Sequence, residues 1–131
     1  MLNMQQHNIL EGILDSTFGK GSMAEKTGQA LRHKIGTDVD GTIMLEIRYE
    51  RGVNFNPLEG IEKQKKSLDK DSFDAIGKKI AEVKKIFREE SETTLKVKPI
   101  SDPQSDVTPI SMNRTLVRAR YRANVVYEIS V

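Results

Sequence analysis

The 131-residue chain contains no cysteine, no tryptophan and only two histidines. Without thiols it can form neither disulfides nor cysteine-based zinc, iron–sulfur or nucleophilic sites. With His7 and His33 as its only imidazoles, the chain has little material for histidine-based metal or triad chemistry. Aromatic residues make up 5% of the sequence, which leaves little for stacking nucleic-acid bases. These absences disfavour an enzyme, and we expect no cofactor, no metal and no small-molecule substrate.

Long apolar runs are also missing. No uncharged stretch approaches the ~20 residues that a membrane-spanning helix needs, so we expect no membrane partner. Residues 1–6 lack the charged and apolar regions of a signal peptide, so secretion by that route is not expected. At 14.8 kDa we expect a single domain over residues 1–131, because two domains would each be too small for a secure core.

The numbers of basic and acidic residues are nearly equal. Lysine and arginine number 21 against 19 acidic residues, a net charge of +2 that does not by itself indicate a nucleic-acid partner. The basic excess late in the chain is concentrated in four arginines, whose planar guanidinium groups suit carboxylates and phosphates equally: Arg114, Arg118, Arg120 and Arg122.

Two helices are predicted at the N-terminus. In residues 5–18, apolar side chains recur at helical spacing. After a Gly-Lys-Gly break, Ser22 and Glu25 resemble a capping box, and a second apolar stripe over residues 23–35 ends at Gly36. Residues 1–36 are therefore predicted to form a helical arm.

The middle of the chain changes from period 2 to period 3.6. Residues 43–55 alternate apolar and charged side chains, which predicts a half-buried strand ending at Pro57. The lysine-rich residues 58–71 predict a surface connection with some helical turns. Residues 73–90, capped at Asp71 and Ser72, carry the strongest apolar stripe and predict a helix lying on a sheet.

The C-terminal part returns to period 2. Residues 93–98 predict a short strand, and residues 99–113, with three prolines, predict a long flexible loop. From residue 117 to 131 nearly every odd position is apolar, which predicts a strand of up to ~16 residues. Such length favours a bend, a bulge or extension into a partner's sheet.

These elements define an α+β fold: N-terminal helices, then β-α-β-β, with one antiparallel or mixed sheet and the helices on one face. In this reading residues 37–131 form the sheet-and-helix core, which includes the flexible loop 99–113.

Three sequence motifs invite a chemical reading. Residues 38–42 match the DxDGT signature of haloacid-dehalogenase phosphatases, but no buried hydrophobic strand is predicted before them, so we interpret them as a turn. They also lack the ligand set of a calcium-binding loop. Residues 19–22 (GKGS) lack phosphate-loop spacing and are interpreted as a helix-breaking turn. Neither histidine has a carboxylate at a recognisable spacing, so both are interpreted as surface or interface residues.

A basic face is the strongest candidate for function. If the predicted strands share one sheet, six basic side chains point away from the helices, alongside Glu46, Glu50 and Glu128. This face fits three roles: a solvated surface with cross-strand ion pairs, a protein interface, or a phosphate-binding surface. The six residues are Arg48, Lys96, Lys98, Arg118, Arg120 and Arg122.

Three segments carry a resemblance: residues 18–25 (FGKGSMAE), 95–98 (LKVK) and 121–128 (YRANVVYE). Together they resemble small proteins of tailed phages, and the order helix, strand, helix and long closing strands is similar to that of tail-terminator and other neck or tail subunits. The resemblance covers the outline of the chain and assigns no catalytic residue. It implies a virion or phage-encoded accessory protein, located in the virion or the host cytoplasm.

The leading hypothesis is therefore a non-enzymatic structural subunit of a homo-oligomeric assembly, a phage virion protein of the neck, tail or capsid-associated kind. Its partners would be copies of itself or other virion proteins. The alternative is a small nucleic-acid-binding accessory protein that uses the basic face of the last strand.

Overall fold

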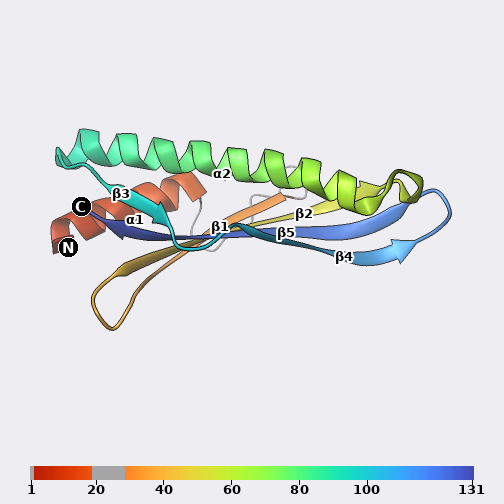
Figure 1. Cartoon of the computed structure of the whole chain (residues 1–131). Helices are drawn as coiled ribbons and strands as arrows, with labels where there is room; N and C mark the ends of the chain where they lie inside the picture. The colour runs from red at the N-terminus through yellow and green to blue at the C-terminus, as the bar shows by residue number, and fades with distance from the viewer. Residues whose placement is uncertain (1, 19–28) are drawn as a thin grey trace.

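The structure, a computed structural model, describes residues 2–18 and 29–131. Within them the chain folds as two long helices and a five-stranded antiparallel sheet, which confirms the α+β class (Figure 1). Both termini lie at one end of the molecule. The elements are α1 (Met4–Phe18), β1 (Gln29–Thr37), β2 (Ile43–Phe55), the short 3-10 helix η1 (Pro57–Glu59), α2 (Ile61–Ser91), β3 (Lys96–Pro99), β4 (Gln104–Met112) and β5 (Val117–Ser130).

Strand β5 is the centre of the sheet. On one side it pairs antiparallel with β2 over nearly its whole length, and β1 lies beyond β2. On its other side it pairs with two strands in succession, β4 along its first half and β3 along its last four residues. The great length of β5 is thus accounted for by partners in its own chain, and no extension into another sheet is needed.

The apolar parity of the strands faces the helices, as the alternation predicts. Odd-numbered residues of β5 are buried from Val117 to Ile129, and Ile43, Leu45 and Ile47 of β2 are buried beside them. The main core cluster joins these strands to both helices. Its members from the helices include Leu10, Ile13, Leu14, Phe18, Ile76, Ile80, Val83 and Phe87.

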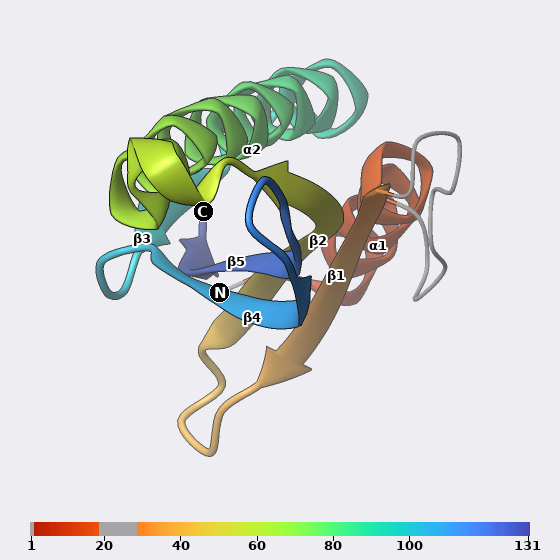
Figure 2. The same ribbon diagram turned by 90° about the vertical axis from the view of Figure 1, so that its right-hand side faces the viewer.

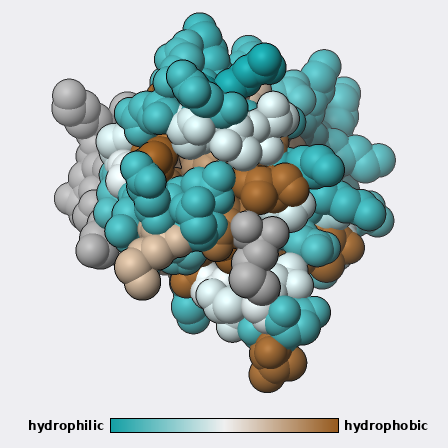
Figure 3. All heavy atoms as spheres, turned by 90° about the vertical axis from the view of Figure 1, so that its left-hand side faces the viewer, coloured by the Kyte–Doolittle hydropathy of each residue, from teal (hydrophilic) through white to brown (hydrophobic). Residues whose placement is uncertain are grey.

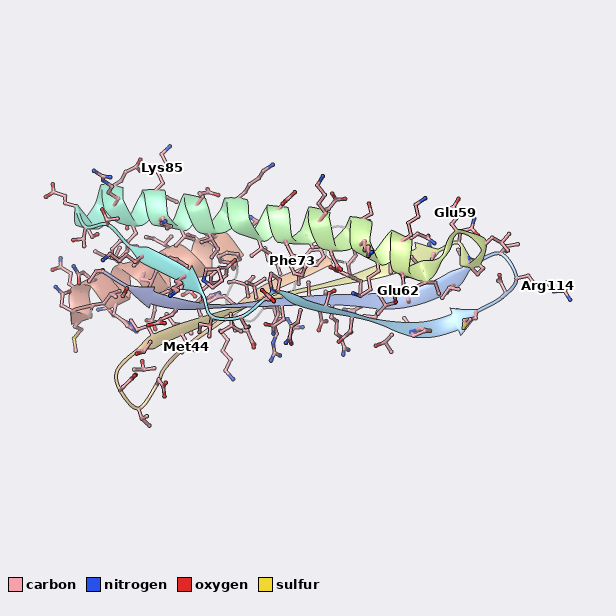
Figure 4. All side chains as sticks on the ribbon, in the orientation of Figure 1. Met44, Glu59, Glu62, Phe73, Lys85 and Arg114 are labelled. Carbon is pink, nitrogen blue, oxygen red and sulfur yellow. The ribbon has the colours of Figure 1, made fainter. Side chains whose placement is uncertain are left out.

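Helix α2 and strand β5 match in length. The 31 residues of α2 span about 46 Å, and the 14 residues of β5 span about the same distance. The helix therefore runs along the sheet for the length of the molecule (Figure 1), with Phe73 directed toward the sheet and Lys85 away from it (Figure 4). At the end that holds the termini, the surface is mostly hydrophilic, with hydrophobic side chains in separate areas (Figure 3).

The predicted second helix is wrong where it can be compared with the structure. Residues 29–37 form strand β1, which pairs with β2 across a hairpin. The part of that prediction on residues 19–28, including the capping box and the GKGS segment, lies outside the described residues. Residues 29–37 form a strand rather than a helix for two reasons. Leu31 and Ile35 lie on the same face of the strand, with charged side chains on the other face, and the hairpin turn carries Gly41, whose φ of 85° suits glycine.

Two further predictions need correction. Helix α2 begins at Ile61. Ser72, which was predicted to cap its N-terminus, lies more than ten residues into the helix and is buried. The predicted flexible loop 99–113 contains strand β4, because proline is tolerated in a strand that lies at a sheet edge. A bulge follows Pro109 in this strand.

Candidate functional site

The basic residues predicted to share a face occupy the side of the sheet opposite the helices. Their registers place Arg48 across from Asn124, and Arg122 across from Glu50. On the other flank of β5, Asp106 of β4 lies across from Arg122. This polar face therefore carries cations and carboxylates in neighbouring positions.

Carboxylates of β2 engage three of the six predicted cations, two of them across to β5 and one within β2. Glu50 of β2 lies 3.2 Å from Arg120 and 3.5 Å from Arg122, measured between carboxylate oxygens and guanidinium nitrogens. Glu46 pairs with Arg48 and also accepts a hydrogen bond of 3.1 Å from the side-chain amide of Asn124. These contacts are the ion pairs expected of a solvated sheet face, and they lower the positive charge available to an outside phosphate.

The remaining three cations are separated in space. Arg118 lies near the start of β5, whereas Lys96 and Lys98 pair with its last residues, Ser130 and Glu128. Ten residues of strand, about 33 Å, separate Arg118 from Glu128. All three are exposed, and none forms an ion pair with another residue of the described part of the chain. The structure thus places the three ion-paired arginines between Arg118 toward one end of the sheet and Lys96 and Lys98 toward the other.

A shallow cavity of about 350 Å³ crosses the polar face over β2, β5 and β4. Its charged lining combines two arginines with two carboxylates, so the cavity has no net charge with which to select an ion. The charged and amide lining residues are Arg48, Glu50, Arg122, Asp106, Asn124 and Gln104.

Strand β4 forms a sheet edge that sequence reasoning missed. Among the described strands β4 pairs with β5 alone, through eight of its nine residues, and Ile110 and Met112 at its end are 69% and 67% exposed. The following turn carries Arg114, which projects from the end of the molecule (Figure 4). The alternation of Ser105 and Val107, partly buried, with exposed neighbours was the available signal, and the prolines obscured it.

A partly buried polar cluster between α2 and the sheet was also not predicted from the sequence. The Tyr121 hydroxyl donates a hydrogen bond of 2.6 Å to Oδ1 of Asp69, and the Tyr121 ring meets Tyr49 edge-on at 6.3 Å. Lys65 lies 3.4 Å from the other oxygen of Asp69. The cluster separates the main core from a smaller apolar cluster around Phe55, Val117 and Ala119.

The electrostatics of this cluster suit structure rather than proton transfer. Burial raises the pKa of Tyr121 well above its usual range, and the hydrogen bond to Asp69 raises it further. Burial also acts to raise the pKa of Asp69, but hydrogen bonds from Ser105 and Tyr121 and the charge of Lys65 outweigh it and lower that pKa. At neutral pH the tyrosine is therefore neutral and the aspartate ionised, so neither is poised to exchange a proton.

The DxDGT segment forms the turn between β1 and β2. The Asp38 amide donates to the Thr42 carbonyl, and an Asp40 side-chain oxygen accepts from the Thr42 amide. Hydrogen bonds from the Thr42 side chain and amide lower the pKa of the exposed Asp40. A strand that the sequence did not predict, β1, leads into Asp38, but it is not the buried hydrophobic strand of the phosphatase signature, since its residues 31–37 are half-buried or exposed. That strand is an antiparallel edge strand, and the turn itself is exposed.

The prediction that neither histidine has a carboxylate beside it is wrong. The His33 side chain is only 6% exposed, and its Nε2 lies 3.3 Å from Oδ1 of Asp15 on α1. His7 has Glu11 one helical turn away, with 3.7 Å between Nδ1 and Oε1. In residues 2–18 and 29–131, no three side chains of metal-binding type come together.

Among the described residues, no helix is both long enough and apolar enough to cross a membrane. Comparison of the chain with models of protein families, with curated proteins and with solved structures finds no match.

Proposed function

We propose that this chain is a non-enzymatic structural subunit that assembles with copies of itself, as a neck, tail or capsid-associated component of a phage virion. The observation that carries the assembly is the outer edge of β4, which no other described strand pairs with, and the exposure of Ile110 and Met112 beside it. An open strand edge presents unpaired amide and carbonyl groups, and apolar residues along it favour pairing with another chain. The phage context comes from the resemblance of the sequence outline.

The polar contact between α2 and β5 and the ion pairs on the opposite face of the sheet are consistent with this role. The partly buried Asp69–Tyr121 pair ties α2 to β5, which gives the long sheet a rigid support. On the opposite face, Glu50 and Glu46 hold the central arginines in fixed positions. A rigid sheet with an open edge is suited to ordered addition of subunits.

Assembly is tested by replacing the exposed apolar residues of β4. We expect the native chain to have a solution mass that is a multiple of 14.8 kDa, and Ile110→Lys/Met112→Lys to reduce it to the monomer mass. Two lysines would place charge where the proposed contact removes water. The measurement is light scattering after size exclusion, with circular dichroism to verify folding.

Val39→Lys is the matched control, because Val39 is an even more exposed apolar residue at the tip of the β1–β2 turn, away from β4. It should leave the mass unchanged. A native chain that stays monomeric at high concentration contradicts the proposal, as does a folded double variant that retains the native mass.

The nucleic-acid alternative is less well supported, since carboxylates already pair with Arg48, Arg120 and Arg122. We expect no saturable binding of a labelled single-stranded oligonucleotide at about 150 mM salt. If the alternative were correct, binding would weaken steeply with salt, and Arg118→Gln would reduce the salt slope by about one. Lys85→Gln, on the outer side of α2, is the control that should leave any such binding unchanged.

A further inference from the structure

The two outer strands of the sheet, β1 and β4, are suited to pair with each other between two copies of the chain. Strands β1 and β4 are nine residues each, and no described strand pairs with the outer side of either (Figure 2). The sheet is four strands across and every neighbouring pair is antiparallel, so β1 and β4 run in opposite directions. A second copy placed alongside in the same orientation therefore brings its β1 antiparallel to β4, with the helix-covered faces on one side.

The side chains restrict the register of such a joint. Even-numbered residues of β1 and residues 104, 106 and 108 of β4 belong to the polar face, so only a register that opposes even to even keeps the two faces continuous. Pro109 has no amide hydrogen, which limits backbone hydrogen bonding at the joint to residues 104–108 and leaves Ile110 and Met112 to contact the neighbouring copy through their side chains. One register within this stretch places Asp106 opposite Lys34. Both are exposed, and neither has an ion pair within the described part of the chain.

This register also sets the stagger between copies. Within one chain Asp106 lies opposite Arg122 of β5. Lys34 lies opposite Glu46 of β2, which in turn lies opposite Val126 of β5. The joint thus displaces each copy by four residues, about 14 Å along the strands, for a sheet width of four strands, about 19 Å. These two lengths correspond to a strand tilt of about 35°, which lies in the range of closed barrels.

We propose that β4 of each copy pairs with β1 of the next, with Asp106 opposite Lys34, so that the copies close into a ring with a continuous antiparallel sheet. This inference rests on the proposed function and specifies the partner surface of the β4 edge. A contact between two different edges repeats head to tail, and the tilt allows it to close.

The absence of native cysteine permits a direct test. In the full chain, Lys34→Cys/Asp106→Cys should give, on mild oxidation, a reducible ladder of bands at multiples of 14.8 kDa that stops at the ring size. Each single cysteine variant should stay at the monomer position on the same gel. A dimer band from Asp106→Cys alone would show two-fold pairing of β4 with itself and overturn the proposal.

Charge exchange provides a second test that does not depend on disulfide geometry. Asp106→Lys should lower the fraction of assembled protein at least severalfold by opposing two lysines, and Asp106→Lys/Lys34→Asp should restore it. If the native protein is oligomeric but neither the ladder nor the restoration appears, the β4–β1 joint is wrong while the proposed function stands. If the native protein is a monomer, both are wrong.

Discussion

Phe87→Ala should lower the free energy of unfolding by about 3–5 kcal/mol, because it removes a fully buried ring and leaves a cavity that the surrounding core can only partly fill. Phe87 lies in the last third of α2 and belongs to the cluster that joins α2 to α1 and to the sheet. Loss of this ring weakens three elements at once. The measurement is the urea midpoint and slope, followed by circular dichroism at fixed protein concentration.

Lys85→Ala is the matched control on the same helix. Its side chain points away from the sheet (Figure 4), so the substitution should change the unfolding free energy by no more than about 0.5 kcal/mol. Equal midpoints for the two variants would show that the buried face of α2 has been assigned incorrectly.

Tyr121→Phe should cost about 1.5–3 kcal/mol, because it removes the donor to a partly buried, ionised Asp69 while leaving the ring in place. Tyr127→Phe is the control. Tyr127 is also buried, and burial raises its pKa, but its hydroxyl has no hydrogen-bond partner among the described residues, so little should be lost. Similar unfolding free energies for the two variants would contradict a stabilising role for the Tyr121–Asp69 bond.

The same pair predicts a pH dependence. The folded-state pKa of Asp69 is lowered, so its contribution to stability is fully present above the ordinary carboxyl value of 3.8 and is lost as the pH falls through the lower folded value. The difference between native protein and Tyr121→Phe should therefore shrink when unfolding is measured at pH 3 instead of pH 7. A difference that stays constant would indicate that the tyrosine hydroxyl acts independently of the carboxylate.

The candidate surface was predicted only in part from the sequence. Strand parity correctly placed Arg118, Arg120 and Arg122 on the face away from the helices, because alternation in a strand is a local property. The neutralisation of Arg120 and Arg122 by Glu50 depends on β2 being adjacent to β5 in one particular register, which no local pattern encodes. The exposed edge of β4 was hidden for a related reason. Its prolines are acceptable only because the strand has a single neighbour.

The sequence by itself determined the elements with strong periodicity: α1, the C-terminal two thirds of α2, β2 and β5, and with them the α+β class and most of the core. In these segments the spacing of apolar side chains alone selects one backbone conformation. Tertiary structure decided the rest. Residues 29–37 became a strand because β2 offered them a partner, and residues 61–72 joined α2 because β5 is long enough to support the extra turns. The contact between Asp69 and Tyr121 is likewise tertiary, since a buried hydroxyl and a partly buried carboxylate satisfy each other only when the fold brings a helix and a strand together.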